Sequence, residues 1–274
     1  MNMKKILLLA ATLVVALSCT ANKAPKALVL YYSQTQTTEK VAQEIAARLG
    51  ADIEEILPVQ PYDGTYQETI TRSGEERSSG NMPAIQPLKA NLKDYDVIFL
   101  GYPIWFGTYA LPVVTLLDEV DFSGKKIVPF CTFGSGGLDV SVRDLKAKQP
   151  KAEVLPGYGV RAARIDAVPQ EVERFLKENG FLEGEYARYD DFPAPHPASE
   201  AEAAIFDAAV STYPMISAKA ENVSARAVTG GTEYLFEAKD TPRGPAPAGM
   251  PAGTIKVYVL DLDGQDPVFT QVVR

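Results

Sequence analysis

The feature of this sequence that most constrains its fold is a series of short apolar runs, each followed by a helical pattern. Residues 27–32 (ALVLYY), 96–102 (DVIFLGY) and 126–132 (KIVPFCT) are nearly continuous apolar segments, which is typical of strands buried on both faces. After the first run, apolar residues recur at every fourth position over residues 38–49, as on one face of a helix. Strands that alternate with helices predict an α/β fold with a doubly wound parallel sheet.

The same alternation continues to about residue 180. Strands are predicted at residues 27–32, 53–57, 96–102, 126–132 and within 152–160, and helices at 38–49, 111–119, 140–148 and 170–179. The polar residues 61–91 are predicted to be helical in part. In a sheet of this kind, ligands bind at the carboxyl ends of the strands. The loops that follow the strands are therefore the candidate site.

The composition changes near residue 185, where a Pro-rich linker is predicted over residues 185–197. A helix is predicted at 203–210. Half-buried antiparallel strands, in which apolar and polar residues alternate, are predicted at 223–228, 232–237, 254–261 and 268–273. Residues 198–274 are thus expected to form a small α+β domain with one helix packed on an antiparallel sheet.

The N-terminus is predicted to be a targeting segment. Lys4 and Lys5 precede an apolar run over residues 6–17, which is too short to span a bilayer but fits the core of a signal peptide. The sequence Ala-Leu-Ser-Cys then ends at Cys19 and resembles the bacterial lipoprotein box. That resemblance implies cleavage after residue 18, a lipid anchor on Cys19 and a place on the membrane of the bacterial cell envelope. The other interpretation is a plain secretory signal with an incidental cysteine.

The charge of the chain restricts its partners. Residues 1–18 contain two lysines and no acids, so their removal changes the formal net charge from −8 to −10. A strongly acidic chain is not expected to bind nucleic acid or an anionic membrane surface, although a lipid anchor needs no basic patch. If Cys19 is acylated, Cys131 is the only free thiol. We therefore predict neither a disulfide nor a cysteine-based metal site.

The loop after the first strand contains six polar residues at the start of a predicted helix. They are Ser33, Gln34, Thr35, Gln36, Thr37 and Thr38. Hydroxyls, backbone amides and the helix dipole favour a phosphate at such a position. Because the loop has no lysine or arginine, it suits a phosphate monoester better than a nucleoside triphosphate. The alternative is simple capping of the helix by Thr37.

Two further loops follow the next buried strands. Pro103, Ile104, Trp105, Phe106 and Gly107 lie beyond the predicted end of one strand, and Trp105, the only tryptophan, can stack on a flat ring. The other loop comprises Thr132, Phe133, Gly134, Ser135 and Gly136, and its glycines allow a ligand to approach the backbone. The alternatives are a core tryptophan and an ordinary flexible turn.

Taken together, the three loops resemble those of the flavodoxin family over about residues 26–180. The family's S-x-T-x-x-T phosphate loop falls on Ser33, Thr35 and Thr38, whereas Gln34 and Gln36 replace common glycines. The resemblance implies that residues 26–184 form a flavodoxin-like domain that binds flavin mononucleotide (FMN). It also implies that residues 33–38, 103–107 and 132–136 hold the cofactor.

The C-terminal region resembles the cystatin-like fold more weakly. Residues 225–237 (ARAVTGGTEYLFE) are similar to the central hairpin of that fold. The glutamine that begins the inhibitory hairpin is replaced by Ala227, and the region has no tryptophan. The resemblance therefore implies the fold without protease inhibition.

These features lead to three hypotheses about function. The first is an FMN-binding lipoprotein in electron transfer, whose redox partner is an unknown protein or a small electron acceptor. The second is an NAD(P)H-dependent FMN or quinone reductase, and the third is a non-redox lipoprotein that binds a partner through its C-terminal domain. We predict no catalytic nucleophile or base and no metal site, and His196, the sole histidine, is interpreted as a surface residue of the linker.

Overall fold

The N-terminal domain is organised around a parallel sheet with the strand order β2-β1-β3-β5-β6. A further short strand, β7, pairs with β5 nearer the carboxyl end of that strand. The computed structural model describes residues 25–211, 213, 216–241 and 253–273. The strands are β1 (Ala27–Tyr31), β2 (Asp52–Glu55), β3 (Val97–Trp105), β5 (Lys126–Phe133), β6 (Glu153–Val154) and β7 (Tyr158–Arg161). β6 and β7 pair with successive parts of β5 and together fill the fifth position, so the prediction of a doubly wound, five-stranded parallel sheet is confirmed.

Helices cover both faces of this sheet. On one face, α1 (Thr37–Leu49) and α5 (Val168–Glu178) form a core with Val29 and Tyr31 of β1. On the other face, α3 (Leu111–Glu119) and α4 (Leu138–Lys148) form a second core with Leu28 and Leu30. Because successive side chains of β1 enter opposite cores, every position in this strand favours an apolar residue. This requirement explains the continuous apolar runs in the sequence.

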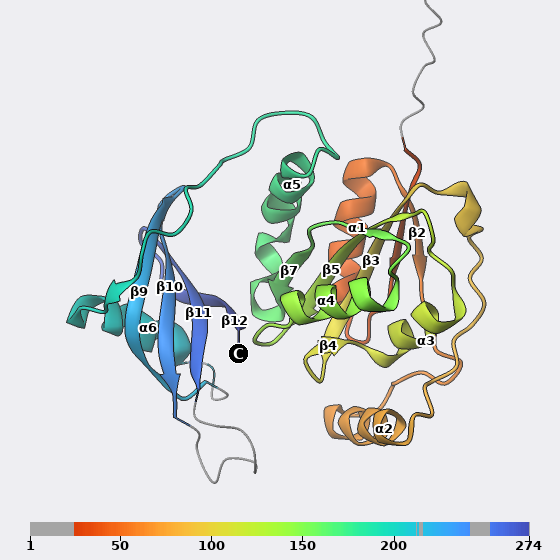
Figure 1. Ribbon diagram of the computed structural model, residues 1–274, viewed down its shortest axis with the longest axis horizontal. Coiled ribbons are helices and arrows are strands. Elements are labelled where there is room, and N and C mark those ends of the chain that lie inside the picture. Colours follow the sequence, from red (N-terminus) through yellow and green to blue (C-terminus); the bar gives the residue numbers. More distant parts are fainter. Residues whose placement is uncertain (1–24, 212, 214–215, 242–252, 274) are drawn as a thin grey trace, which may run out of the picture.

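The C-terminal domain is an antiparallel sheet with the strand order β12-β11-β10-β9-β8 and one covering helix (Figure 1). Its elements are β8 (His196–Pro197), α6 (Glu200–Ser211), β9 (Ala218–Val228), β10 (Gly231–Asp240), β11 (Thr254–Leu262) and β12 (Val268–Val273). The helix packs through Phe206, whose ring centroid lies 5.2 Å from that of Phe236. The predicted α+β architecture is confirmed.

The segment between the domains follows the second sheet. Arg226 of β9 lies over the ring of Phe192, 4.3 Å from its centroid, and also donates a hydrogen bond of 3.2 Å to the carbonyl of Asp190. The range 185–197 is predicted as linker, but His196 and Pro197 instead form β8, which pairs with β9. His196 remains exposed, as expected.

Four further elements belong to the N-terminal domain. They are the helix α2 (Tyr66–Ser79), the short strand β4 (Thr108–Tyr109) and the 3-10 helices η1 (Leu92–Asp94) and η2 (Ala162–Ala167). The predicted signal peptide at residues 1–18 and the lipidation site Cys19 lie outside the described residues. Within the described part of the chain, no helix has the length and apolar character needed to cross a membrane.

Candidate functional site

The three predicted loops all emerge from one edge of the parallel sheet. The pairings of β1 with β3, of β3 with β5 and of β5 with β7 are all parallel, so the carboxyl ends of these strands lie at the same edge. In Figure 1, α2 and β4 lie beyond this edge. The structure therefore brings together the segments that the sequence places far apart.

The first loop leads into α1 without the usual side-chain cap. Gln36 is the N-cap residue, with φ 61° and ψ 0°, and its side chain makes no capping hydrogen bond. Thr37 is already the first helical residue, so the alternative in which Thr37 caps the helix is wrong. Ser33 instead accepts a hydrogen bond of 3.3 Å from the amide of Glu39. The first turn of α1 keeps other amide donors available for an anion.

The side chains of two residues of this loop, Gln34 and Thr38, form hydrogen bonds with other parts of the protein. The side-chain amide Nε2 of Gln34 donates to the hydroxyl of Thr69 in α2 at 2.8 Å. Thr38 is buried, and its hydroxyl shares a hydrogen bond of 2.8 Å with that of Thr132 at the end of β5. The hydroxyls of Thr35 and Thr37 are exposed and lie 3.3 Å apart. Thr35 and Thr37 therefore present polar groups to solvent, whereas Thr38 links the first loop to the third.

The second loop is a tight hairpin and not an irregular loop. β3 continues through Trp105 because Ile104 pairs with Tyr109 and Trp105 with Thr108 of β4. The prediction that Trp105 lies outside the strand is therefore wrong. The two turn residues, Phe106 and Gly107, both have positive φ, 50° and 85°. Such a two-residue turn suits the twist of a hairpin, but it forces the non-glycine residue Phe106 into a rarely adopted conformation.

Trp105 belongs to an aromatic cluster at the edge of the site. Its ring meets those of Tyr32 and Tyr62 edge to face, with centroid distances of 5.7 and 5.0 Å. The indole also packs against the core below the hairpin, although it is not fully buried. The side chain of Phe106 is exposed. Stacking of Trp105 on a flavin remains a prediction.

The third loop lies between the parallel sheet and the C-terminal domain. Thr132 and Phe133 belong to β5, and residues 134–137 connect this strand to α4. A Cβ atom added to Gly136 would lie only 2.2 Å from the carbonyl oxygen of Val272 in β12. Glycine at position 136 is thus required by the neighbouring domain, whereas the sequence suggested only a close approach of the ligand.

Sequence reasoning missed the contribution of α2. Arg72 lies over the ring of Tyr62, 4.0 Å from its centroid, and Arg77 lies over the ring of Phe106 at 5.3 Å. Arg77 also donates a hydrogen bond of 3.3 Å to the carbonyl of Phe106. The three loops contain no cation, but α2 brings two arginines to this edge of the sheet. No fixed spacing within residues 61–91 indicated their position.

Acidic groups also border the first loop. Burial, followed by the charge of Glu39, raises the pKa of the Glu55 carboxyl at the end of β2. Burial and the same two carboxylates raise the pKa of the Tyr31 phenol to about 12. An anion in the first loop is therefore favoured by helix amides and hydroxyls and disfavoured by the nearby acids.

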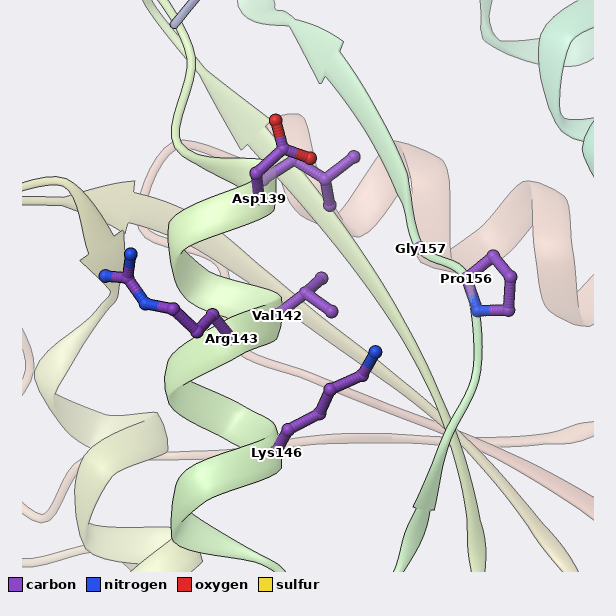
Figure 2. A pocket seen from close by; sticks show the side chains of 7 residues that line it. Asp139, Val142, Arg143, Lys146, Pro156 and Gly157 are labelled. Carbon is purple, nitrogen blue, oxygen red and sulfur yellow. The ribbon is translucent and has the colours of Figure 1, made fainter. Parts of the chain in front are cut away.

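Two surface cavities lie near the α4 side of the domain. One of about 470 Å³ runs along α4, where Asp139, Arg143 and Lys146 line it opposite Pro156 (Figure 2). The other, of about 760 Å³, lies between α5 and the C-terminal sheet. Its charged lining is largely paired, as in Arg164 with Glu171 at 2.7 Å and Arg226 with Glu233 at 2.6 Å. Neither cavity includes the three predicted loops.

A doubly wound α/β domain with a hydroxyl-rich loop at the start of its first helix defines a flavodoxin-like protein. The family model described as Flavodoxin matches residues 26–174, and the chain belongs to this family. No curated protein matches the chain. The resemblance stated for the N-terminal domain is therefore confirmed, whereas the cystatin-like resemblance of the C-terminal domain stays a prediction.

Solved structures with similarity to the chain include three flavoproteins. One from Bacteroides eggerthii is 33% identical, with coverage of 52% of this chain and 94% of its own and a TM-score of 0.46. One from Bacteroides uniformis is 30% identical, with coverage of 55% and 99% and a TM-score of 0.49. A flavoprotein from Lactobacillus acidophilus, solved in complex with FMN, is 24% identical, with coverage of 54% and 99% and a TM-score of 0.46. Each of them spans only about half of this chain.

Proposed function

We propose that this protein is an FMN-binding flavoprotein that transfers electrons while it is held to the bacterial cell envelope by a lipid on Cys19. Membership of the flavodoxin family supports FMN as the cofactor. The observation that carries the proposal is the convergence of three features at one sheet edge. These features are the start of α1, whose N-cap residue Gln36 makes no side-chain capping hydrogen bond, the Trp105 hairpin and the loop after β5.

The residues at this edge fit FMN. The exposed hydroxyls of Thr35 and Thr37, with the first amides of α1, would hold the phosphate. Trp105 and Phe106 would contact the isoalloxazine ring, and the backbone of residues 134–136 would line it. Bound FMN supplies one- and two-electron transfer, while the protein positions the ring and sets its potential. The donors offered to the phosphate are neutral, which suits a monoester.

The experiment is an FMN titration of the full chain, followed by the quenching of flavin fluorescence. We expect stoichiometric binding and a yellow protein as purified from its natural host. A chain that binds no FMN under these conditions would contradict the proposal. Steady-state oxidation of NAD(P)H by the isolated protein would support a reductase over a carrier that needs a partner enzyme.

The lipid anchor is tested separately. Mass spectrometry of the N-terminal peptide is expected to show a diacylated or triacylated Cys19, and a Cys19→Ser variant is expected to leave the membrane fraction. A full-length chain with an unmodified thiol at position 19, still in the membrane fraction, would contradict the anchor and leave the FMN proposal intact.

A further inference from the structure

The third loop of the flavodoxin domain contacts the free edge of the C-terminal sheet at Val272. β12 is an edge strand of its own sheet, and the amide of Val272 donates a hydrogen bond of 2.6 Å to the carbonyl of Ser135. The carbonyl of Val272 lies directly against Gly136. Since both backbone groups of Val272 point away from β11, this contact uses the side of β12 that an edge strand would otherwise expose.

A buried arginine also joins the third loop to β12. Arg161 ends β7, and its guanidinium donates hydrogen bonds to the carbonyls of Gly134 at 3.0 Å and Phe269 at 2.7 Å. The guanidinium also lies over the ring of Phe269, 3.4 Å from its centroid. Burial lowers the pKa of Arg161, and no carboxylate in the described part of the chain pairs with it. Two backbone carbonyls and an aromatic face therefore compensate this charge.

These contacts determine which way the peptide groups of the third loop point. The carbonyl of Gly134 accepts a hydrogen bond from Arg161, and the carbonyl of Ser135 accepts one from the amide of Val272. In a trans peptide the carbonyl and the following N–H point in opposite directions. The amides of Ser135 and Gly136 therefore point away from these partners, and neither donates to another residue in the described part of the chain.

We propose that the C-terminal domain completes the flavin site, with Arg161 as a positioning residue that holds the third loop with the amides of Ser135 and Gly136 turned toward the cofactor. This inference rests on the proposed FMN binding. Amides aimed at acceptor atoms of the isoalloxazine bind the flavin and favour its electron-rich reduced form. Docking of the C-terminal domain and binding of FMN are then linked, so each strengthens the other by the same factor.

One pair of full-length variants tests the contribution of β12. Val272→Pro removes the amide donor to Ser135 and, because this amide faces away from β11, leaves the ladder with β11 intact. Val272→Ala keeps the amide and removes more of the side chain than Val272→Pro does. We expect Val272→Pro to raise the Kd for FMN about fivefold to tenfold, the loss of roughly one hydrogen bond, and Val272→Ala to change it less than twofold. FMN should also slow amide hydrogen exchange in β12 of the parent and should do so less in Val272→Pro.

A second pair tests Arg161. Arg161→Gln removes the charge, whereas Arg161→Lys keeps it. We expect the midpoint potential of the bound FMN to fall in Arg161→Gln and to recover in Arg161→Lys, a pattern that a loss of fold would not produce. If the parent binds FMN and both Val272→Pro and Arg161→Gln match it in affinity and potential, the inference is overturned and the proposed function stands. If the parent binds no FMN, the proposed function itself fails.

Discussion

Thr38 and Thr132 share a buried hydrogen bond of 2.8 Å between their hydroxyls, although 94 residues separate them in the chain. This bond ties the start of α1 to the end of β5, the two places from which the first and third loops emerge. Thr38→Val leaves the hydroxyl of Thr132 buried without its partner. We expect a loss of about 1–3 kcal/mol in the free energy of unfolding. Urea denaturation of the N-terminal domain, followed by the fluorescence of Trp105, measures it.

The matched control for this bond is the double variant Thr38→Val with Thr132→Val. Replacement of both partners by apolar groups of the same shape leaves no orphaned hydroxyl, so its cost should be smaller than the sum of the two single changes. Strictly additive costs would show that the two hydroxyls do not stabilise each other. FMN affinity should follow the same order, since the bond holds two loops of the proposed site together.

Gln36 occupies a left-handed backbone conformation that glycine adopts without cost. Its φ of 61° places it where a non-glycine residue loses about 1–2 kcal/mol. We therefore expect Gln36→Gly to raise the free energy of unfolding by about 0.5–1 kcal/mol, after allowance for the greater freedom of glycine in the unfolded chain. Gln36→Ala keeps the strain and should give no gain. Equal effects of both changes would assign the cost to side-chain contacts of Gln36.

Removal of the indole at position 105 should weaken FMN binding. The rings of Tyr32 and Tyr62 contact the indole of Trp105 edge to face and hold it in place. No neighbouring side chain can therefore easily take the position of the indole after its removal. We expect Trp105→Ala to raise the Kd about tenfold and Trp105→Phe, which keeps an aromatic ring, to raise it less than threefold. Titrations followed by flavin fluorescence distinguish these outcomes. Unchanged binding in Trp105→Ala would contradict the assignment of this hairpin to the flavin site.

The raised pKa of Glu55 predicts a pH-dependent stability. Because the folded protein binds this proton more tightly than the unfolded chain does, the ionised carboxyl destabilises the fold. The penalty is absent below the ordinary pKa of 4.5, grows as the pH rises through the folded value and is complete above it. Glu55→Gln should thus stabilise the protein at pH 7 and have little effect at pH 4. Denaturation of the parent and of Glu55→Gln across this range tests it.

The order of helices and strands was largely readable from the sequence, because burial on both faces requires continuous apolar runs such as residues 96–102. The boundaries were less accessible where pairing extends a strand. β3 continues to Trp105 through a hairpin whose turn contains Phe106, and no glycine or asparagine at that position signalled a positive φ. β8 escaped prediction because a two-residue strand with a proline has no pattern of its own.

The site was predictable only where its residues follow a strand directly. The positions of the first and third loops at the carboxyl edge of the sheet follow from the α/β pattern, whereas their contact with a ligand stays a prediction. The contacts of Arg72 and Arg77 with the second loop, and of Arg161 with β12, depend on how distant elements pack. Neither spacing nor composition carries that information, so these residues required the structure.

The contact between Arg161 and Phe269 joins two residues that are synthesised at different times. Phe269 is made 108 residues after Arg161, which corresponds to about 5–20 s of synthesis at ordinary rates. During this interval the parallel sheet has all its strands, while the carbonyl of Ser135 still lacks its partner in β12. A chain that ends between residues 184 and 267 keeps all strands of the parallel sheet but lacks this partner, and is therefore expected to bind FMN less tightly than the full chain.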